Sequence, residues 1–181
     1  MFWFNLFLAC AAPLDIADTA SLIEKEEETF CATLRGEQIC DFQSIDELGQ
    51  ATELSSLYGK PVVLDLSAMW CGPCIQSAAG MQAKADALPD VVFLTVLIED
   101  VQGNPPDESD IIRWSEDNGI ISEPVWGASR ELLTQDPLEM KDHLYLAGWP
   151  TFYFIDSDGK LQDYMRGYEP NTLLEKAAGL D

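Results

Sequence analysis

Two cysteines separated by Gly-Pro constrain the fold of this chain more than any other feature. Cys71 and Cys74 stand between a continuous apolar run, residues 61–67, and a segment of helical character, residues 72–88. The apolar run is typical of a buried central strand, so the motif predicts a strand, a tight connection and then a helix. Two intervening residues place the second cysteine one helical turn after the first, within reach of a disulfide.

The start of a helix is a place where cysteine becomes reactive. Free backbone N–H groups and the helix dipole stabilise a thiolate, so the pKa of Cys71 is expected to fall to about 7. Pro73 fits in the first turn, because its missing N–H would have no partner within the helix. A zinc half-site and a structural pair are the alternatives. Zinc is disfavoured because Cys31 and Cys40 are poorly spaced for the other half.

From residue 43 onward, strand and helix patterns alternate. Strands are expected at 61–67, 91–98, 151–155 and 160–166, and helices at 72–88, 110–118 and 170–178. Between residues 120 and 147 we expect a short strand near Val125 and one or two short helices. A length of 181 residues suits one α/β domain with extensions better than two domains.

The N-terminal residues 1–12 are expected to be an export signal. Residues 1–9 are almost all apolar, but the run is too short to span a bilayer. The sequence around Cys10 is similar to the end of a bacterial lipoprotein signal, which makes Cys10 a candidate for lipidation; an ordinary cleavage site is the alternative. Residues 13–29 are acidic and predict a tether or a short helix. We therefore expect an extracytoplasmic protein, either periplasmic or lipid-anchored to a bacterial membrane.

The main domain is expected to span residues 30–181 and to begin with a hairpin, residues 30–42, around Arg35-Gly36. With a two-residue turn, Cys31 and Cys40 face each other as a non-hydrogen-bonded pair whose Cα atoms lie about 4.5 Å apart. This separation is within disulfide range. We expect a structural Cys31–Cys40 disulfide, and two free buried thiols are the alternative.

The charge of the chain excludes one class of partner. Ten basic residues face 32 acidic ones, a formal net charge of −22. Such a polyanion repels phosphate backbones and anionic lipid surfaces, so we expect no nucleic-acid partner, and a membrane only through a possible lipid anchor. One histidine, His143, is too few for a histidine-based metal site or a Ser-His-Asp relay. Neither a metal nor a cofactor is expected.

The residues around the cysteine motif resemble the thioredoxin-like superfamily. Residues 63–74 look like its active-site segment, and residues 148–151 fall where the superfamily has its cis-proline loop. Residues 54–61 and 154–161 resemble the exported TlpA/ResA-like branch. The resemblance covers roughly residues 42–178, and it implies a thioredoxin fold with a central mixed sheet flanked by helices.

The resemblance also implies roles for individual residues. Cys71 would attack substrate disulfides, Cys74 would resolve the mixed disulfide, and Pro150 would be cis and pack against the pair. The expected substrate-binding residues are Trp70, Gly72, Pro73, Trp149 and Pro150. Trp149 replaces a usually smaller residue, which predicts an unusual substrate surface; a core position is the alternative.

Asp65 interrupts the apolar strand that precedes the cysteines. Burial of a carboxylate is costly and raises its pKa, so Asp65 is expected to accept a proton near neutral pH. The resemblance places it beneath Cys74, as the base for the resolving step, and a solvent-facing aspartate is the alternative. Thioredoxin has a lysine near its buried aspartate, in the strand that residues 96–100 would form here. This chain has none in that segment, so its proton handling is expected to differ.

These features together predict a thiol–disulfide oxidoreductase that reduces or exchanges protein disulfides outside the cytoplasm. Its expected partners are protein disulfide substrates and an unidentified thiol electron donor. The Gly72-Pro73 pair favours the reducing direction, and an oxidase or isomerase remains open. A peroxiredoxin is disfavoured, because no Pro-x-x-x-Thr-x-x-Cys segment is present. The alternatives are a copper-handling redoxin-like protein that uses His143 and a non-catalytic scaffold.

Overall fold

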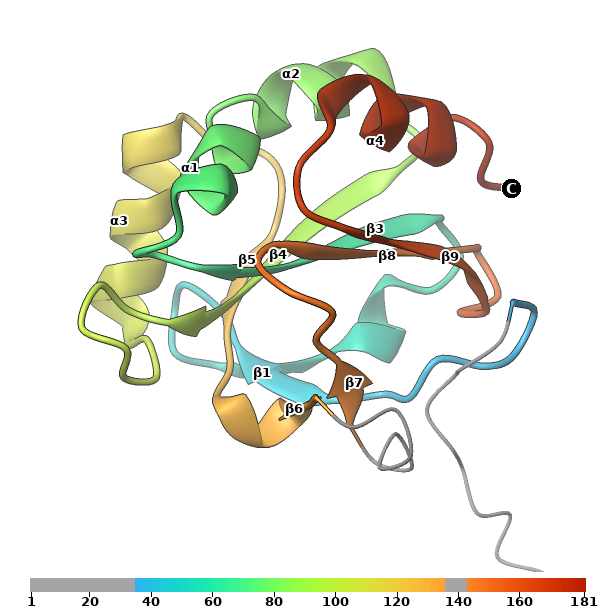
Figure 1. Cartoon of the computed structure of the whole chain (residues 1–181). Coiled ribbons are helices and arrows are strands. Elements are labelled where there is room, and N and C mark those ends of the chain that lie inside the picture. Colours follow the sequence, from blue (N-terminus) through green and yellow to red (C-terminus); the bar gives the residue numbers. More distant parts are fainter. Residues whose placement is uncertain (1–34, 136–142) are drawn as a thin grey trace, which may run out of the picture.

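The centre of the protein is a seven-stranded mixed sheet, seen in a computed structural model that describes residues 35–135 and 143–181 (Figure 1). The strand order is β2-β1-β5-β4-β3-β8-β9. The strands are β1 (Gln43–Ile45), β2 (Ala51–Glu53), β3 (Val62–Ala68), β4 (Val92–Glu99), β5 (Val125–Gly127), β8 (Thr151–Ile155) and β9 (Leu161–Arg166). A separate parallel pair joins β6 (Leu133–Thr134) to β7 (Leu144–Tyr145). The strands expected from the sequence are confirmed with small shifts of their ends, and the thioredoxin-like fold is confirmed with them.

The helices of the described residues are α1 (Gly72–Ala78), α2 (Met81–Ala87), α3 (Glu108–Asn118) and α4 (Pro170–Ala177), with 3-10 turns η2 (Leu54–Leu57) and η3 (Arg130–Leu132). The expectation of one helix over residues 72–88 is wrong, because the helix breaks before α2. Glycine is a weak helix former, and the N–H of Gly80 donates to the carbonyl of Ser77, three residues back.

Helix α3 begins two residues earlier than expected. Asp107 caps it, and its carboxylate accepts from the backbone of Asp110 while the Asp110 side chain accepts from the backbone of Asp107. Gly119 ends it in the left-handed conformation, with φ of 65°. No helix in the described ranges is long and apolar enough to cross a bilayer.

Strand β3 lies inside the sheet, between β4, to which it is parallel, and β8, to which it is antiparallel. Alternate residues of β3 enter two different cores: Val63 packs with the α-helices on one face, and Leu64 and Leu66 pack on the other face. The first core contains both Cys71 and Cys74, together with side chains from all four α-helices. Figure 1 shows α1, α2 and α4 on one side of β3, β8 and β9, and the separate pair β6 and β7 on the other.

The described half of the expected N-terminal hairpin lies along the turn between β8 and β9. The N–H of Gly36 donates to the carbonyl of Leu161 at 2.7 Å, and the backbones of Gln38 and Lys160 form an isolated antiparallel β-bridge. Cys31 and the rest of the expected hairpin lie outside the described residues. So do the expected export signal and acidic tether. The hairpin and the Cys31–Cys40 disulfide therefore stay predictions.

Candidate redox site

Cys71 and Cys74 form a disulfide at the carboxyl end of β3, with their Cα atoms 5.2 Å apart. Cys71 is the N-cap of α1, and its Sγ accepts a hydrogen bond from the N–H of Cys74 at 3.2 Å. Cys74 is fully buried, whereas Cys71 keeps 3% of its surface exposed. Gly72 and Pro73 are exposed beside it. The two cysteines are therefore inequivalent, and Cys71 is the one that reaches the surface.

The loop before β8 carries the expected cis-proline. The Trp149–Pro150 peptide bond is cis, as predicted. Two hydrogen bonds hold the loop: the Thr151 hydroxyl donates to the carbonyl of Gly148 at 2.6 Å, and the N–H of Gly167 donates to the carbonyl of Pro150 at 2.7 Å. These two bonds fix the backbone on both sides of Trp149.

Trp70 and Trp149 meet beside the cysteines in an edge-to-face contact, with their ring centroids 5.9 Å apart. Trp70 is 47% exposed, and Trp149 is half-buried against both cores. Trp149 is thus partly a core residue and partly exposed, and its role at the substrate surface stays a prediction. The contact brings the cis-proline loop against the cysteine motif.

Two residues that the sequence analysis missed complete this arrangement. The indole N–H of Trp70 donates to Oε2 of Glu99 at 2.7 Å, and Arg130 pairs with the other oxygen of Glu99. The Arg130 guanidinium also lies 5.9 Å from the ring centroid of Trp149. Burial would raise the pKa of Glu99, but the hydrogen bonds from Arg130 and Trp70 outweigh burial and lower it. These four side chains form a closed ring of contacts that holds both indoles.

Asp65 is fully buried, as expected, and the alternative of a solvent-facing aspartate is excluded. Asp65 follows Val63 by two residues in β3, and residues two apart in a strand point to the same face. Its side chain therefore lies on the face that holds the cysteines. Ser67 Oγ donates to its Oδ1 at 2.7 Å, and Oδ2 has no hydrogen-bond partner among the described residues. Burial raises the pKa of Asp65 to about 7, although the Ser67 hydrogen bond, the charge of Lys84 and the Ser77 hydroxyl each lower it. Such a group can gain and lose a proton near neutral pH.

Lys84 is a third residue whose role the sequence analysis missed. Strand β4 contains no lysine, and the positive charge that lowers the pKa of Asp65 comes instead from Lys84 on α2. A signal was present in the sequence: Lys84 follows Met81 by three residues and precedes Ala85, both of which are buried on the inward face of α2. A lysine in that apolar stripe points to a buried partner.

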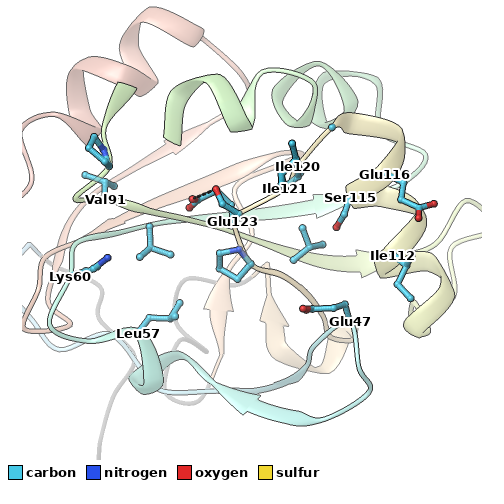
Figure 2. Close-up of a pocket in the computed structure, with 16 residues that line it drawn as sticks. Glu47, Leu57, Lys60, Val91, Ile112, Ser115, Glu116, Ile120, Ile121 and Glu123 are labelled. Carbon is cyan, nitrogen blue, oxygen red and sulfur yellow. Dashed lines mark hydrogen bonds between the residues drawn. The ribbon is translucent and has the colours of Figure 1, made fainter. Parts of the chain in front are cut away.

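A pocket of about 810 Å³, whose lining residues are drawn in Figure 2, is distant from this site. Val91, Ile120 and Glu123 line it, and they come from the segments that lead into β4 and β5. Cys71, in contrast, follows the carboxyl end of β3, which runs parallel to β4. The cavity therefore lies at the opposite end of the strands and is not part of the redox site.

The described residues contain no group of three His, Cys, Asp or Glu side chains arranged to hold a metal ion. His143 is half-buried at the start of the second described range, and Cys10 lies outside both ranges. The geometry of the described residues therefore supplies a dithiol, a buried acid and an aromatic surface, which together suit thiol–disulfide exchange.

Comparisons with known proteins agree with this chemistry. The model of the AhpC/TSA family matches residues 35–164. A thioredoxin from Geodia cydonium is 30% identical over 117 residues, which are 65% of this chain and 76% of that protein. A thioredoxin from Ophiophagus hannah is 40% identical over 50 residues, 28% of this chain. This match spans only 48% of the length of that relative.

Solved structures include a similar thioredoxin that is described as an exposed lipoprotein. The pneumococcal exposed lipoprotein thioredoxin Etrx1, from Streptococcus pneumoniae, is 26% identical with a TM-score of 0.55. The match covers 78% of this chain and 100% of that structure. The similarity extends across the sheet and its helices rather than being limited to the cysteine motif.

Proposed function

The chain belongs to the AhpC/TSA family of thioredoxin-like thiol–disulfide oxidoreductases, and from this premise we propose that it reduces or exchanges protein disulfides through Cys71 and Cys74. The observation that carries the proposal is the inequivalence of the two cysteines. Cys71 reaches the surface beside Trp70, whereas Cys74 is fully buried on the face that holds Asp65. One thiol is thus placed to meet substrate and the other to act internally.

In the reducing direction, the Cys71 thiolate attacks one sulfur of a substrate disulfide. A bond forms between Cys71 Sγ and that sulfur, and the other substrate sulfur leaves as a thiolate. The backbone N–H of Cys74, which donates to Cys71 Sγ, stabilises negative charge on this atom. The product of this step is a mixed disulfide at Cys71.

The resolving step needs a base beneath Cys74. We assign this role to Asp65, whose side chain is buried on the same face and whose pKa of about 7 suits it to accept the Cys74 proton, directly or through water. The Cys74 thiolate then attacks Cys71 Sγ, closes the internal disulfide and releases the second substrate sulfur. Two electrons pass from the dithiol to the substrate, and an external thiol donor must return them before another cycle.

Trapping the intermediate tests the assignment. Cys74→Ala should accumulate a mixed disulfide on Cys71 when it is mixed with a protein disulfide such as insulin, because nothing resolves it. Cys71→Ala is the matched control and should accumulate far less, since its remaining thiol is buried. Mass spectrometry of the adducts decides the question, and equal trapping by both variants would contradict the assigned order.

We further propose that this chemistry takes place outside the cytoplasm. The apolar run at residues 1–9 and the sequence around Cys10 support export, and the similar pneumococcal protein is an exposed lipoprotein. Mass spectrometry of the mature protein should find residues 1–9 removed, and Cys10 either acylated or removed as well. A mature protein that retains Met1 would contradict this proposal.

A further inference from the structure

An exposed arginine lies against the cis-proline loop. Arg166 is the last residue of β9, and its register partner on β8 is Thr151, which follows Pro150 directly. Thr151 also pairs with Leu66, near the carboxyl end of β3. Arg166 therefore lies at the end of the sheet that carries the redox pair, two strands away from the segment that leads to the cysteines.

The side chain of Arg166 packs on the backbone of Gly148, within the same loop. A Cβ on Gly148 would stand 2.6 Å from Arg166 Nε and 3.3 Å from its Cζ. Because glycine has no Cβ, the guanidinium can approach the loop this closely. It is thus held one residue away from Trp149, the ring that contacts Trp70 beside the cysteines.

No carboxylate pairs with Arg166 within residues 35–135 and 143–181. The other arginine at this loop, Arg130, differs, because Glu99 already pairs with it. Arg113 on α3 is likewise paired, with Asp110. Acidic side chains are abundant in the chain, with 32 against ten basic ones, yet none of those described is placed to meet Arg166. The N–H donors of its guanidinium are therefore available to a ligand.

The charge of Arg166 governs its surroundings at short range. The net charge of −22 repels acidic ligands at a distance. At physiological ionic strength, however, exposed charges more than about 8 Å apart are largely screened from each other. A substrate group within hydrogen-bond reach of the guanidinium therefore responds mainly to Arg166. A carboxylate suits this position, since its two oxygens match the planar N–H fork of arginine.

We propose that Arg166 is a substrate-recognition residue that selects protein disulfides with an acidic side chain close to the reacting cysteine. The inference rests on the proposed thiol–disulfide chemistry and names a substrate class for it. While Cys71 Sγ reacts with the substrate sulfur, a substrate chain that passes over Trp149 places a neighbouring residue beside Gly148, where Arg166 binds its carboxylate. A lysine at that substrate position meets a like charge and is disfavoured.

Peptide substrates that differ only in charge test this selection. Three synthetic peptides, each closed by one disulfide, carry Glu, Gln or Lys at the positions that flank one cysteine, and kcat/KM is measured with wild type and Arg166→Gln. Comparison of the two proteins on the same peptide cancels the effect of the flanking charge on the disulfide itself. Arg166→Gln should lose about three- to fivefold on the Glu peptide, as expected for an exposed ion pair. It should be unchanged on the Gln peptide and faster on the Lys peptide.

Arg113→Gln is the matched control. It removes the same charge from an exposed arginine on α3, which packs beside β5 and is separated from β9 by β4, β3 and β8. All three rates should stay unchanged. Arg166→Glu should reverse the preference, so that the Lys peptide reacts faster than it does with wild type. An equal loss on all three peptides in Arg166→Gln, or an unchanged rate on the Glu peptide, would overturn the inference.

A binding measurement separates this inference from the proposed function. When serine replaces both cysteines of the Glu peptide, no exchange can occur, but titration should still shift the NMR signal of the Arg166 Nε–H. The signal is assigned by its loss in Arg166→Gln, and the Lys version of the peptide should leave it in place. No shift with the Glu version would overturn the inference. Failure of the wild type to reduce any of the disulfide peptides would instead refute the proposed function, and the titration would still decide the role of Arg166.

Discussion

Replacement of Asp65 by asparagine should stabilise the protein, and the gain should depend on pH. The carboxyl is fully buried, and its pKa of about 7 lies roughly three pH units above the value of 3.8 for a free aspartate. The folded state therefore binds the proton more tightly than the unfolded state does. Stability falls as pH rises through the window between these two values, and it levels off above the upper one.

The size of the effect follows from the width of that window. At about 1.4 kcal/mol per pH unit, ionisation of Asp65 costs the folded state about 4 kcal/mol once the pH exceeds 7. Asparagine never ionises, and its oxygen can still accept from Ser67. The difference in unfolding free energy between Asp65→Asn and wild type should be near zero at pH 4 and about 4 kcal/mol in favour of the variant at pH 8.

Urea denaturation of the oxidised proteins, followed by circular dichroism between pH 4 and pH 8, measures this difference. The wild type and variant share every other titrating group, so their contributions largely cancel. Asp90→Asn is the control, because Asp90 is exposed in the loop before β4 and its loss should bring no comparable gain. A stability difference that stays constant across the pH range would refute the argument that Asp65 is ionised at a cost within the folded protein.

The remaining predictions concern the substrate surface and the N-terminal cysteine. Trp149→Ala should slow reaction with protein disulfides more than with a small dithiol probe, because its half-buried ring contacts Trp70 beside the cysteines, where only a large substrate would reach it; equal slowing would indicate a packing role. Glu99→Gln should weaken the contacts that hold both indoles and cost about 1–2 kcal/mol in urea denaturation, and it should raise tryptophan mobility in fluorescence anisotropy. Unchanged anisotropy would contradict that role. Peptide mapping under non-reducing conditions should recover Cys31 linked to Cys40, whereas a link from Cys31 to the redox pair would disprove this prediction.

Strong local patterns in the sequence predicted the centre of the fold. The apolar run before Cys71 became β3, and Pro150 has the cis peptide that the resemblance implied. Burial of Asp65 also followed from sequence, because a lone charge within an apolar strand leaves few other places for it. The strand and the buried aspartate depend on residues adjacent in the chain, which is why they could be predicted, whereas the cis peptide followed from the resemblance alone.

The features that were missed depend on contacts between distant segments. Strands β1, β2, β6 and β7 have two or three residues each, too few to show a period. Arg130 meets Glu99 across 31 positions of sequence, and no pattern along the chain marks that pair. Lys84 differs from these, because its burial could have been predicted from its place in the apolar stripe of α2. The groups that it meets there could not have been predicted.

The pairing of residues 36–39 with the β8–β9 turn also determines which way the redox face points. That turn lies beyond the end of β8 that pairs with Val62, at the start of β3, whereas Cys71 follows the far end of the same strand. The backbone carbonyl of Asp181 accepts from Ser157 in this turn, so the C-terminus lies there too (Figure 1). Residue 36 and the C-terminus therefore both lie at the end of the sheet opposite the disulfide, so a tag or a surface linkage attached at the C-terminus is anchored away from Cys71.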